Sequence, residues 1–130
     1  MVKILLFTAN IVQHLDIVSL GLKKIQHKTN DDRSLEYVVN ACQTGKAFFF
    51  MSAGGGFVVL EPKATTPISV NVWLAFSEEG DAIQQYESEI VRLASEIDAE
   101  RLTFQSPRKG YQRALAHWQR DGINYHRSVP

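Results

Sequence analysis

The segment VNVWLAFSEEGDAIQQYESEIVRLASEI, residues 70–97, sets the expected architecture of this chain. Its first part, residues 70–76, is a mostly apolar run that predicts a buried strand. A polar loop at residues 77–80 follows, and Asp81 then opens a long amphipathic helix. The apolar side chains of that helix recur every three or four residues and share one face: Ile83, Tyr86, Ile90, Leu93 and Ile97. A strand, a tight glycine loop and a helix N-terminus bring backbone N–H groups together, which suits a phosphate or another anion.

Composition places the chain among ordinary globular proteins. Its 130 residues predict one domain spanning residues 1–130, and the hydrophobic fraction of 45% is enough for a core without metals or disulfides. The formal net charge is zero, so we expect neither a nucleic-acid nor a membrane partner. A lone cysteine, Cys42, excludes an internal disulfide and a multi-cysteine zinc site.

The N-terminal sequence MVKILLF is too short an apolar run for a secretory signal, and polar residues interrupt it from Thr8 onward. No window approaches the roughly 18 apolar residues of a membrane helix. We therefore expect a soluble, cytoplasmic protein, in the host cytoplasm if a phage encodes it.

The part of the chain before residue 70 reads as a strand, two helices and a hairpin. Residues 2–8 predict the strand, and Asn10 caps a helix over residues 11–28. A turn and cap at residues 30–32 precede a second helix, which ends at Gly45.

Residues 46–60 then predict a β-hairpin whose turn contains three consecutive glycines, with a loop bracketed by Pro62 and Pro67 after it.

The part after residue 97 reads as a strand, a helix and a strand. Residues 101–105 predict the first strand, and Ser106-Pro107 marks the start of a helix that Gly122 ends. Residues 123–129 predict a last strand at the edge of the sheet. The order β-α-α-β-β-β-α-β-α-β predicts an α/β domain with a mixed sheet and α+β character, helices lying on both faces. Strands 70–76 and 101–105 are expected to be parallel neighbours.

This order resembles the fold of the GNAT family of N-acetyltransferases over nearly the whole chain. The family's pyrophosphate loop has Gln or Arg, two residues, Gly, one residue, then Gly or Ala. The similar stretch here is residues 77–82, SEEGDA, in which Gly80 and Ala82 match and Ser77 stands at the basic or amide position. The family often has a tyrosine in its last helix, where this chain has Trp118. Residues 104–111, FQSPRKGY, also look like small acetyltransferase-like proteins of phages and prophages.

The resemblance implies transfer of an acetyl group from acetyl-coenzyme A to an amine of a small molecule or a protein. It implies that the strand at residues 70–76 holds the pantetheine arm by its backbone near Leu74 and Phe76. The pyrophosphate would then lie at the following helix start, against Glu79, Gly80, Asp81 and Ala82.

The acidic loop supports a second interpretation. Glu78, Glu79 and Asp81 would stand beside the phosphates, and like charges about 4 Å apart cost roughly 1 kcal/mol in water and roughly 4 kcal/mol near a protein surface. A helix N-terminus returns only about 0.3–1 kcal/mol to an anion. The same residues can simply cap the helix, with Asp81 and Gln84 resembling a capping box. The alternative is a non-catalytic GNAT-like phage protein, a binding or virion-associated component.

Candidate catalytic groups are few. Indole has no titratable proton in the useful range, so Trp118 cannot protonate a departing thiolate, whereas Tyr111 or Tyr125 can. Glu61, after the second hairpin strand, is the best-placed general base. The histidines are scattered without metal-ligand spacing, so we expect no metal site: His14, His27, His117 and His126.

Overall fold

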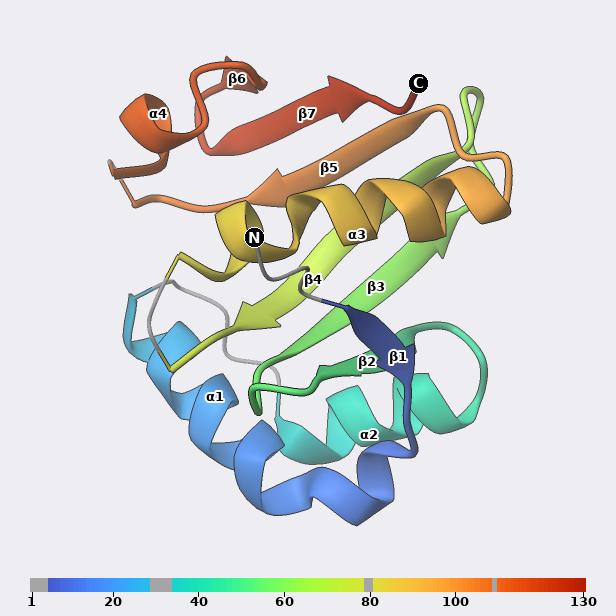
Figure 1. Cartoon of the computed structure of the whole chain (residues 1–130), viewed down its shortest axis with the longest axis vertical. Coiled ribbons are helices and arrows are strands. Elements are labelled where there is room, and N and C mark those ends of the chain that lie inside the picture. Colours follow the sequence, from blue (N-terminus) through green and yellow to red (C-terminus); the bar gives the residue numbers. More distant parts are fainter. Residues whose placement is uncertain (1–4, 29–33, 79–80, 109) are drawn as a thin grey trace.

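A computed structural model describes residues 5–28, 34–78, 81–108 and 110–130. Within these ranges, seven strands form one mixed sheet in the order β1-β2-β3-β4-β5-β7-β6 (Figure 1). The strands are β1 (Leu6–Thr8), β2 (Phe48–Ser52), β3 (Phe57–Lys63), β4 (Ser69–Phe76), β5 (Arg101–Gln105), β6 (Gln119–Asp121) and β7 (Asn124–Ser128). The helices are the 3-10 helix η1 (Ile11–His14), α1 (Leu15–Lys28), α2 (Leu35–Gln43), α3 (Ala82–Glu96) and α4 (Gly110–Ala114). None of the described helices is long and apolar enough to span a membrane.

The sheet has a hydrophobic core on each face. Alternate strand residues pack with α3 on one face, among them Val58, Leu60, Val70, Val72, Leu102 and Phe104. The intervening residues pack with α1 and α2 on the other face, among them Phe49, Met51, Phe57, Val59, Leu74 and Phe76. The period of two along each strand produces this division, since successive side chains point to opposite faces. The fold class expected from the sequence, an α/β domain with helices on both faces, is confirmed.

The parallel pairing expected from the long strand–helix unit is also confirmed. β4 and β5 are parallel neighbours, and α3 crosses between them over one face of the sheet (Figure 1). Of the helix face predicted from spacing, Ile83, Tyr86 and Ile90 are buried. Ile97 is exposed instead, because the helix ends at Glu96 before that residue can face the sheet.

A bulge interrupts β4 and reverses its pleat. Val72 lies opposite Leu60 and Leu74 lies opposite Val59, so Trp73 is the extra residue on this strand. Before the bulge the even-numbered residues face α3, and after it they face α1 and α2. Both faces of β4 are buried and its pleat reverses at Trp73. These two features explain why its sequence is an apolar run without regular alternation.

The N-terminal half agrees with expectation except at two boundaries. Asn10 caps η1, since its side-chain oxygen accepts from Val12 N at 3.0 Å. The cap expected at residues 30–32 falls outside the described residues, and α2 is capped by Ser34, which accepts from Tyr37 N at 3.1 Å. Pro62 does not begin a loop: antiparallel pairing with β4 extends β3 past it to Lys63.

The C-terminal segment differs most from expectation. The helix expected from Ser106-Pro107 to Gly122 is the single short helix α4, beginning at Gly110. Gly122, at φ 62°, instead turns the chain between β6 and β7. The last strand is therefore not at the edge, because β6 pairs along its outer side. The tertiary pairing of β6 with β7 outweighs the helical preference of this segment.

Candidate functional site

The sheet divides between β4 and β5. These strands pair at three positions, Ser69 with Arg101, Val70 with Leu102 and Asn71 with Thr103. Beyond Thr103, β5 continues beside β7 while β4 continues beside β3. Figure 1 shows the ends of β4 and β5 well apart, with the start of α3 near the division. A cavity of about 340 Å³ lies there.

The walls of this cavity, the β4–β5 cavity, come from α1, β4, α3, β5, α4 and the segments beside them. The second half of β4, the start of α3, the segment after β5 and the end of α1 all contribute. Apolar walls are supplied by Val72, Ala75, Ala82 and Ile83. Of the cofactor residues expected from the sequence, Phe76, Asp81 and Ala82 line the cavity, whereas Leu74 is buried in the core beside it. Glu79 and Gly80 lie outside the described residues.

The start of α3 is not a capping box. Asp81 is the N-cap residue, but its backbone is left-handed at φ 55°, and its side chain makes no cap hydrogen bond. The expected partnership of Asp81 with Gln84 is therefore wrong, since this backbone conformation does not deliver the carboxylate to the first-turn N–H groups. Near the start of α3, Ser77 Oγ donates a hydrogen bond to Gln85 Oε1 at 3.1 Å.

Charges of both signs line the β4–β5 cavity. Glu78 and Asp81 contribute carboxylates, and Lys24 and Arg108 contribute cations from α1 and from the segment after β5. The guanidinium of Arg108 lies 5.2 Å from the centre of the Tyr111 ring, close enough for a cation–π contact. The cavity thus combines apolar strand walls with two cations, and its carboxylates remain a source of repulsion for an anion.

Tyr111 is the titratable hydroxyl of the cavity wall. Burial raises the pKa of Tyr111, while the charge and hydrogen bond of Arg108 act against that rise. The phenol is therefore protonated at neutral pH and can donate a proton. Its ring packs edge-on against Phe104, with the ring centres 5.3 Å apart.

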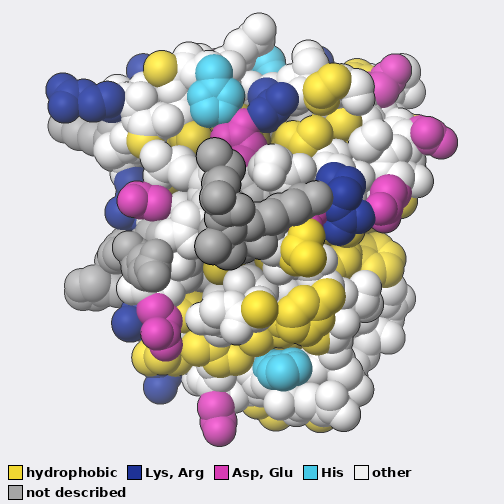
Figure 2. Space-filling view, viewed as in Figure 1, with side chains coloured by type: hydrophobic (Ala, Val, Ile, Leu, Met, Phe, Trp, Pro, Cys, Tyr) yellow, Lys and Arg dark blue, Asp and Glu magenta, His cyan; other side chains and the backbone are white. Residues whose placement is uncertain are grey.

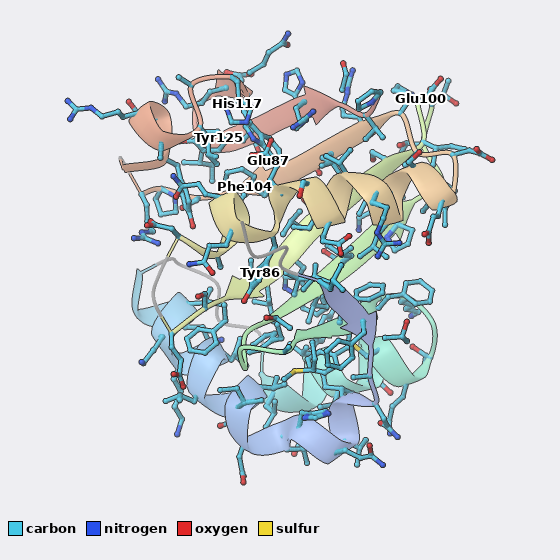
Figure 3. All side chains as sticks on the ribbon, viewed as in Figure 1. Tyr86, Glu87, Glu100, Phe104, His117 and Tyr125 are labelled. Atoms are coloured by element: carbon cyan, nitrogen blue, oxygen red, sulfur yellow. The ribbon has the colours of Figure 1, made fainter. Side chains whose placement is uncertain are left out.

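The other two aromatic candidates lie inside the core. Tyr125 stacks on Phe104 with ring centres 4.5 Å apart, and Figure 3 shows both side chains between α3 and the last strands. Trp118, 5% exposed, packs edge-on against the same Phe104 at 5.1 Å. The expected burial of Trp118 with Tyr111 and Leu115 is confirmed for the indole. Neither Tyr125 nor Trp118 lines the β4–β5 cavity.

Glu61 belongs to a chain of polar side chains at the point where β4 and β5 begin to separate. Asn71 Nδ2 donates to Glu61 Oε1 at 3.0 Å, and Thr103 Oγ1 donates to Asn71 Oδ1 at 2.8 Å. Since Val70 and Val72 face α3, Asn71 between them points to the opposite face. Asn71 is not among the residues predicted from the sequence, although it is the single amide within the apolar run at residues 70–76.

Metal binding and catalysis by a cysteine thiol find no support in the described part of the chain. It contains no group of three His, Cys, Asp or Glu side chains able to hold a metal ion. Burial raises the pKa of Cys42 to about 11, so this thiol is almost entirely protonated at neutral pH and is a poor nucleophile.

Comparison with known proteins gives the fold. No family model matches the sequence, and no curated protein matches it. Solved structures do match. N-acetylglutamate synthase from Neisseria gonorrhoeae, in complex with coenzyme A and N-acetyl-glutamate, is similar with a TM-score of 0.71 and 17% identity. The match covers 100% of this chain but 36% of the synthase, so this chain spans about a third of its length.

Two structures of similar size match from end to end. A GNAT-family acetyltransferase from Staphylococcus aureus Mu50 has a TM-score of 0.68 and 8% identity, covering 98% of this chain and 99% of the other. An acetyltransferase from Thermus thermophilus has a TM-score of 0.62 and 15% identity, covering 98% of each chain. At these identities the likeness concerns the fold alone: this chain is an α/β domain with a GNAT-like fold.

Proposed function

We propose that the chain binds acetyl-coenzyme A in the β4–β5 cavity and transfers the acetyl group to an amine. The observation that carries the proposal is the separation of β4 from β5 after three paired positions, with a cavity at the division. The matching structure of N-acetylglutamate synthase contains bound coenzyme A, which supports the same choice of cofactor here.

The residues of the cavity fit such a group in three respects. A strand edge that leaves its neighbour can pair with the amides of an extended ligand, and the backbone near Leu74 and Phe76 would do so here. Val72 and Ala75 offer apolar contact to the arm. The start of α3 with Arg108 and Lys24 offers positive charge to the phosphates. The volume of about 340 Å³ lies in the range of ligand sites.

Bound acetyl-coenzyme A would supply the acetyl group as a thioester. The proposed roles of this chain are to hold the arm along β4, to accept a proton from the acceptor's ammonium group so that the amine can attack, and to give a proton to the departing sulfur. Glu61 is the candidate for the first proton transfer, because its carboxylate is held beside the division of the sheet by the hydrogen bond from Asn71. Tyr111 is the candidate for the second, because its hydroxyl is protonated and its side chain lines the cavity.

Substitution of the two tyrosines tests the acid. Tyr111→Phe removes the hydroxyl from the cavity wall, and we expect kcat to fall by about 10²-fold or more while coenzyme A affinity stays within twofold. Tyr125→Phe is the matched control, since it makes the same change in a ring that stacks on the same Phe104 but does not itself line the cavity. Acetyl transfer is measured by thiol release and affinity by calorimetry. Loss of transfer in Tyr125→Phe alone would reverse the assignment.

A non-catalytic role, as a binding or virion-associated component, is the second candidate. The observation in its favour is that the carboxylates of Glu78 and Asp81 line the cavity. It predicts no heat and no thermal shift with millimolar coenzyme A, whereas the first candidate predicts both.

A further inference from the structure

A second cavity lies among α2, β2, β3 and β4. Its volume is about 460 Å³, and its lining includes Tyr37 and Lys46 near α2, Glu61 and Lys63 on β3, and Trp73 at the β4 bulge. Trp73 lines both this cavity and the β4–β5 cavity. We call the second cavity the Trp73 cavity. The residue that the two cavities share is thus the one that the bulge inserts into the strand.

Hydrogen bonds connect Glu61, in the wall of the Trp73 cavity, to the point where β4 and β5 separate. Glu61 in its wall accepts from Asn71, and Asn71 accepts from Thr103 at the last paired position of β4 and β5. Glu61 is paired with Asn71 across β3 and β4, so a molecule bound beside Glu61 would lie one strand away from the last paired position of β4 and β5.

The charges of the Trp73 cavity indicate what kind of amine would fit. Glu61 is mostly enclosed, with 17% of its side chain exposed, and it already has Lys63 Nζ at 3.6 Å. Lys46 adds a second ammonium group to the lining. One carboxylate against two cations disfavours a purely cationic ligand such as a polyamine, because its second charge would face a lysine.

The aromatic side chains complete the arrangement. Tyr37 meets Trp73 edge to face with ring centres 5.8 Å apart, so the lining near Glu61 includes aromatic rings as well as a carboxylate. Both groups favour an ammonium ion, whereas the two lysines favour a carboxylate or another anion. A small molecule carrying both charges satisfies all four groups.

We propose that the Trp73 cavity binds the acetyl acceptor, and that this acceptor is a small amine carrying an anionic group, such as an acidic amino acid. The proposal rests on the proposed acetyl transfer and names its substrate class. Lys46 and Lys63 would hold the anionic group, and Glu61 would face the ammonium group.

Atoms and charge balance in the transfer step. The ammonium group first gives one proton to Glu61, which passes it to solvent. The resulting amine then bonds to the acetyl carbonyl carbon and loses a second proton to water. The carbon–sulfur bond breaks, and the sulfur takes a proton from Tyr111, which regains one from water. Ammonium and thioester become amide, thiol and one released proton, and nothing is oxidised or reduced.

Competing acceptors test the substrate class. With acetyl-coenzyme A, we expect kcat/KM for glutamate to exceed that for putrescine, a diamine without a carboxylate, by about tenfold or more. The double variant Lys46→Gln, Lys63→Gln should lose this preference, because glutamate is held less tightly while putrescine is repelled less. Lys23→Gln, which removes an exposed lysine of α1 outside both cavities, is the matched control and should keep it.

Glutamate binding without the coenzyme separates this inference from the proposed function. Tryptophan fluorescence should change on glutamate titration in the wild type and not in Trp73→Phe, which retains Trp118. Glutamate binding without any coenzyme A binding would uphold the cavity assignment and overturn acetyl transfer. Coenzyme A binding with putrescine as the better acceptor, or with no fluorescence response to glutamate, would overturn this inference alone.

Discussion

At the scale of single residues, three consecutive glycines of the β2–β3 hairpin have three different surroundings. Gly55 has a φ of +93°, which L side chains rarely adopt. A Cβ on Gly56 would lie 2.0 Å from Tyr86 Oη and 2.4 Å from the carbonyl oxygen of Phe76. A Cβ on Gly54 would meet only Ser52 Oγ at 3.6 Å, an ordinary contact. The hairpin turn thus passes directly against α3 and the end of β4.

This difference predicts that Gly56→Ala destabilises the protein by about 3 kcal/mol, since the added methyl must displace a backbone carbonyl as well as a tyrosine hydroxyl. Gly54→Ala is the control and should change the free energy of unfolding by less than about 0.5 kcal/mol. Urea unfolding of both variants measures the difference. Equal midpoints for the two would show that the backbone of β4 yields to the methyl group.

Single residues are also where the sequence was least informative about the site. The tyrosine of the family resemblance corresponds to Trp118, which proves to be core, whereas Tyr111, seven positions earlier, lines the cavity. Both occur at helix-like spacing, and spacing cannot distinguish a ring packed in the core from one at a cavity wall. Asn71 was overlooked because its meaning depends on Glu61 and Thr103, which only strand pairing brings beside it.

At the scale of elements, α3 is tied to the C-terminal strands by charge as well as by packing. Glu87, with 13% of its side chain exposed, accepts from His117 Nε2 at 2.7 Å and from Arg127 Nη1 on β7. Figure 3 shows Glu87 and His117 directed toward one another, and Figure 2 shows acidic, basic and histidine side chains together on that part of the surface. This contact fixes β7 over the helix that begins at the proposed phosphate site.

We therefore expect Glu87→Gln to cost about 1.5 kcal/mol of unfolding free energy, because a partly buried carboxylate between two donors is worth more than an exposed ion pair. Glu96→Gln, whose carboxylate meets Arg92 on the exposed side of the same helix, is the control and should cost less than about 0.5 kcal/mol. A double-mutant cycle of Glu87→Gln with Arg127→Met isolates the coupling of this pair. A coupling near zero would mean that apolar packing alone holds β7.

Element types were predictable where the period was long and strongly marked, as in α3, and wherever turn residues were distinctive, as in the β2–β3 hairpin. The segment from residue 107 to 121 was mistaken for one helix. Tyr111, Leu115 and Trp118 have helical spacing, but the last helical bond is Leu115 N to Tyr111 O, and Trp118 N then turns back to Leu115 O. A short helix followed by a turn brings the same residues inward, so the apolar pattern does not distinguish the two.

At the scale of the whole molecule, one sheet is continuous at one end and divided at the other. Backbone pairing between β4 and β5 holds the two halves together up to the division. The hydrogen bonds that link the side chains of Glu61, Asn71 and Thr103 do the same. Beyond it, each half continues with its own neighbours, β3 on one side and β7 on the other. The cavity is therefore a consequence of topology. Its carboxylates, Glu78 and Asp81, were visible in the sequence beside the expected phosphate site, whereas Lys24 of α1 reaches the cavity only through the fold.

The charges of the β4–β5 cavity lead to a prediction about coenzyme A affinity. Glu78 lines the β4–β5 cavity as an exposed carboxylate and would repel the coenzyme's phosphates. We expect Glu78→Gln to strengthen coenzyme A binding by a factor of about two to five at low salt, and the gain should shrink at physiological ionic strength, where screening acts over about 8 Å. Calorimetry at two salt concentrations measures both effects.

Glu36→Gln is the matched control, because Glu36 is likewise an acidic residue near a helix start, in the first turn of α2 and outside both cavities. It should leave coenzyme A affinity unchanged at either salt concentration. Weaker binding in Glu78→Gln would mean that this carboxylate accepts a hydrogen bond from the coenzyme rather than repelling it. An equal gain in both variants would assign the effect to the net charge of the molecule, and the phosphates would then lie elsewhere than at the start of α3.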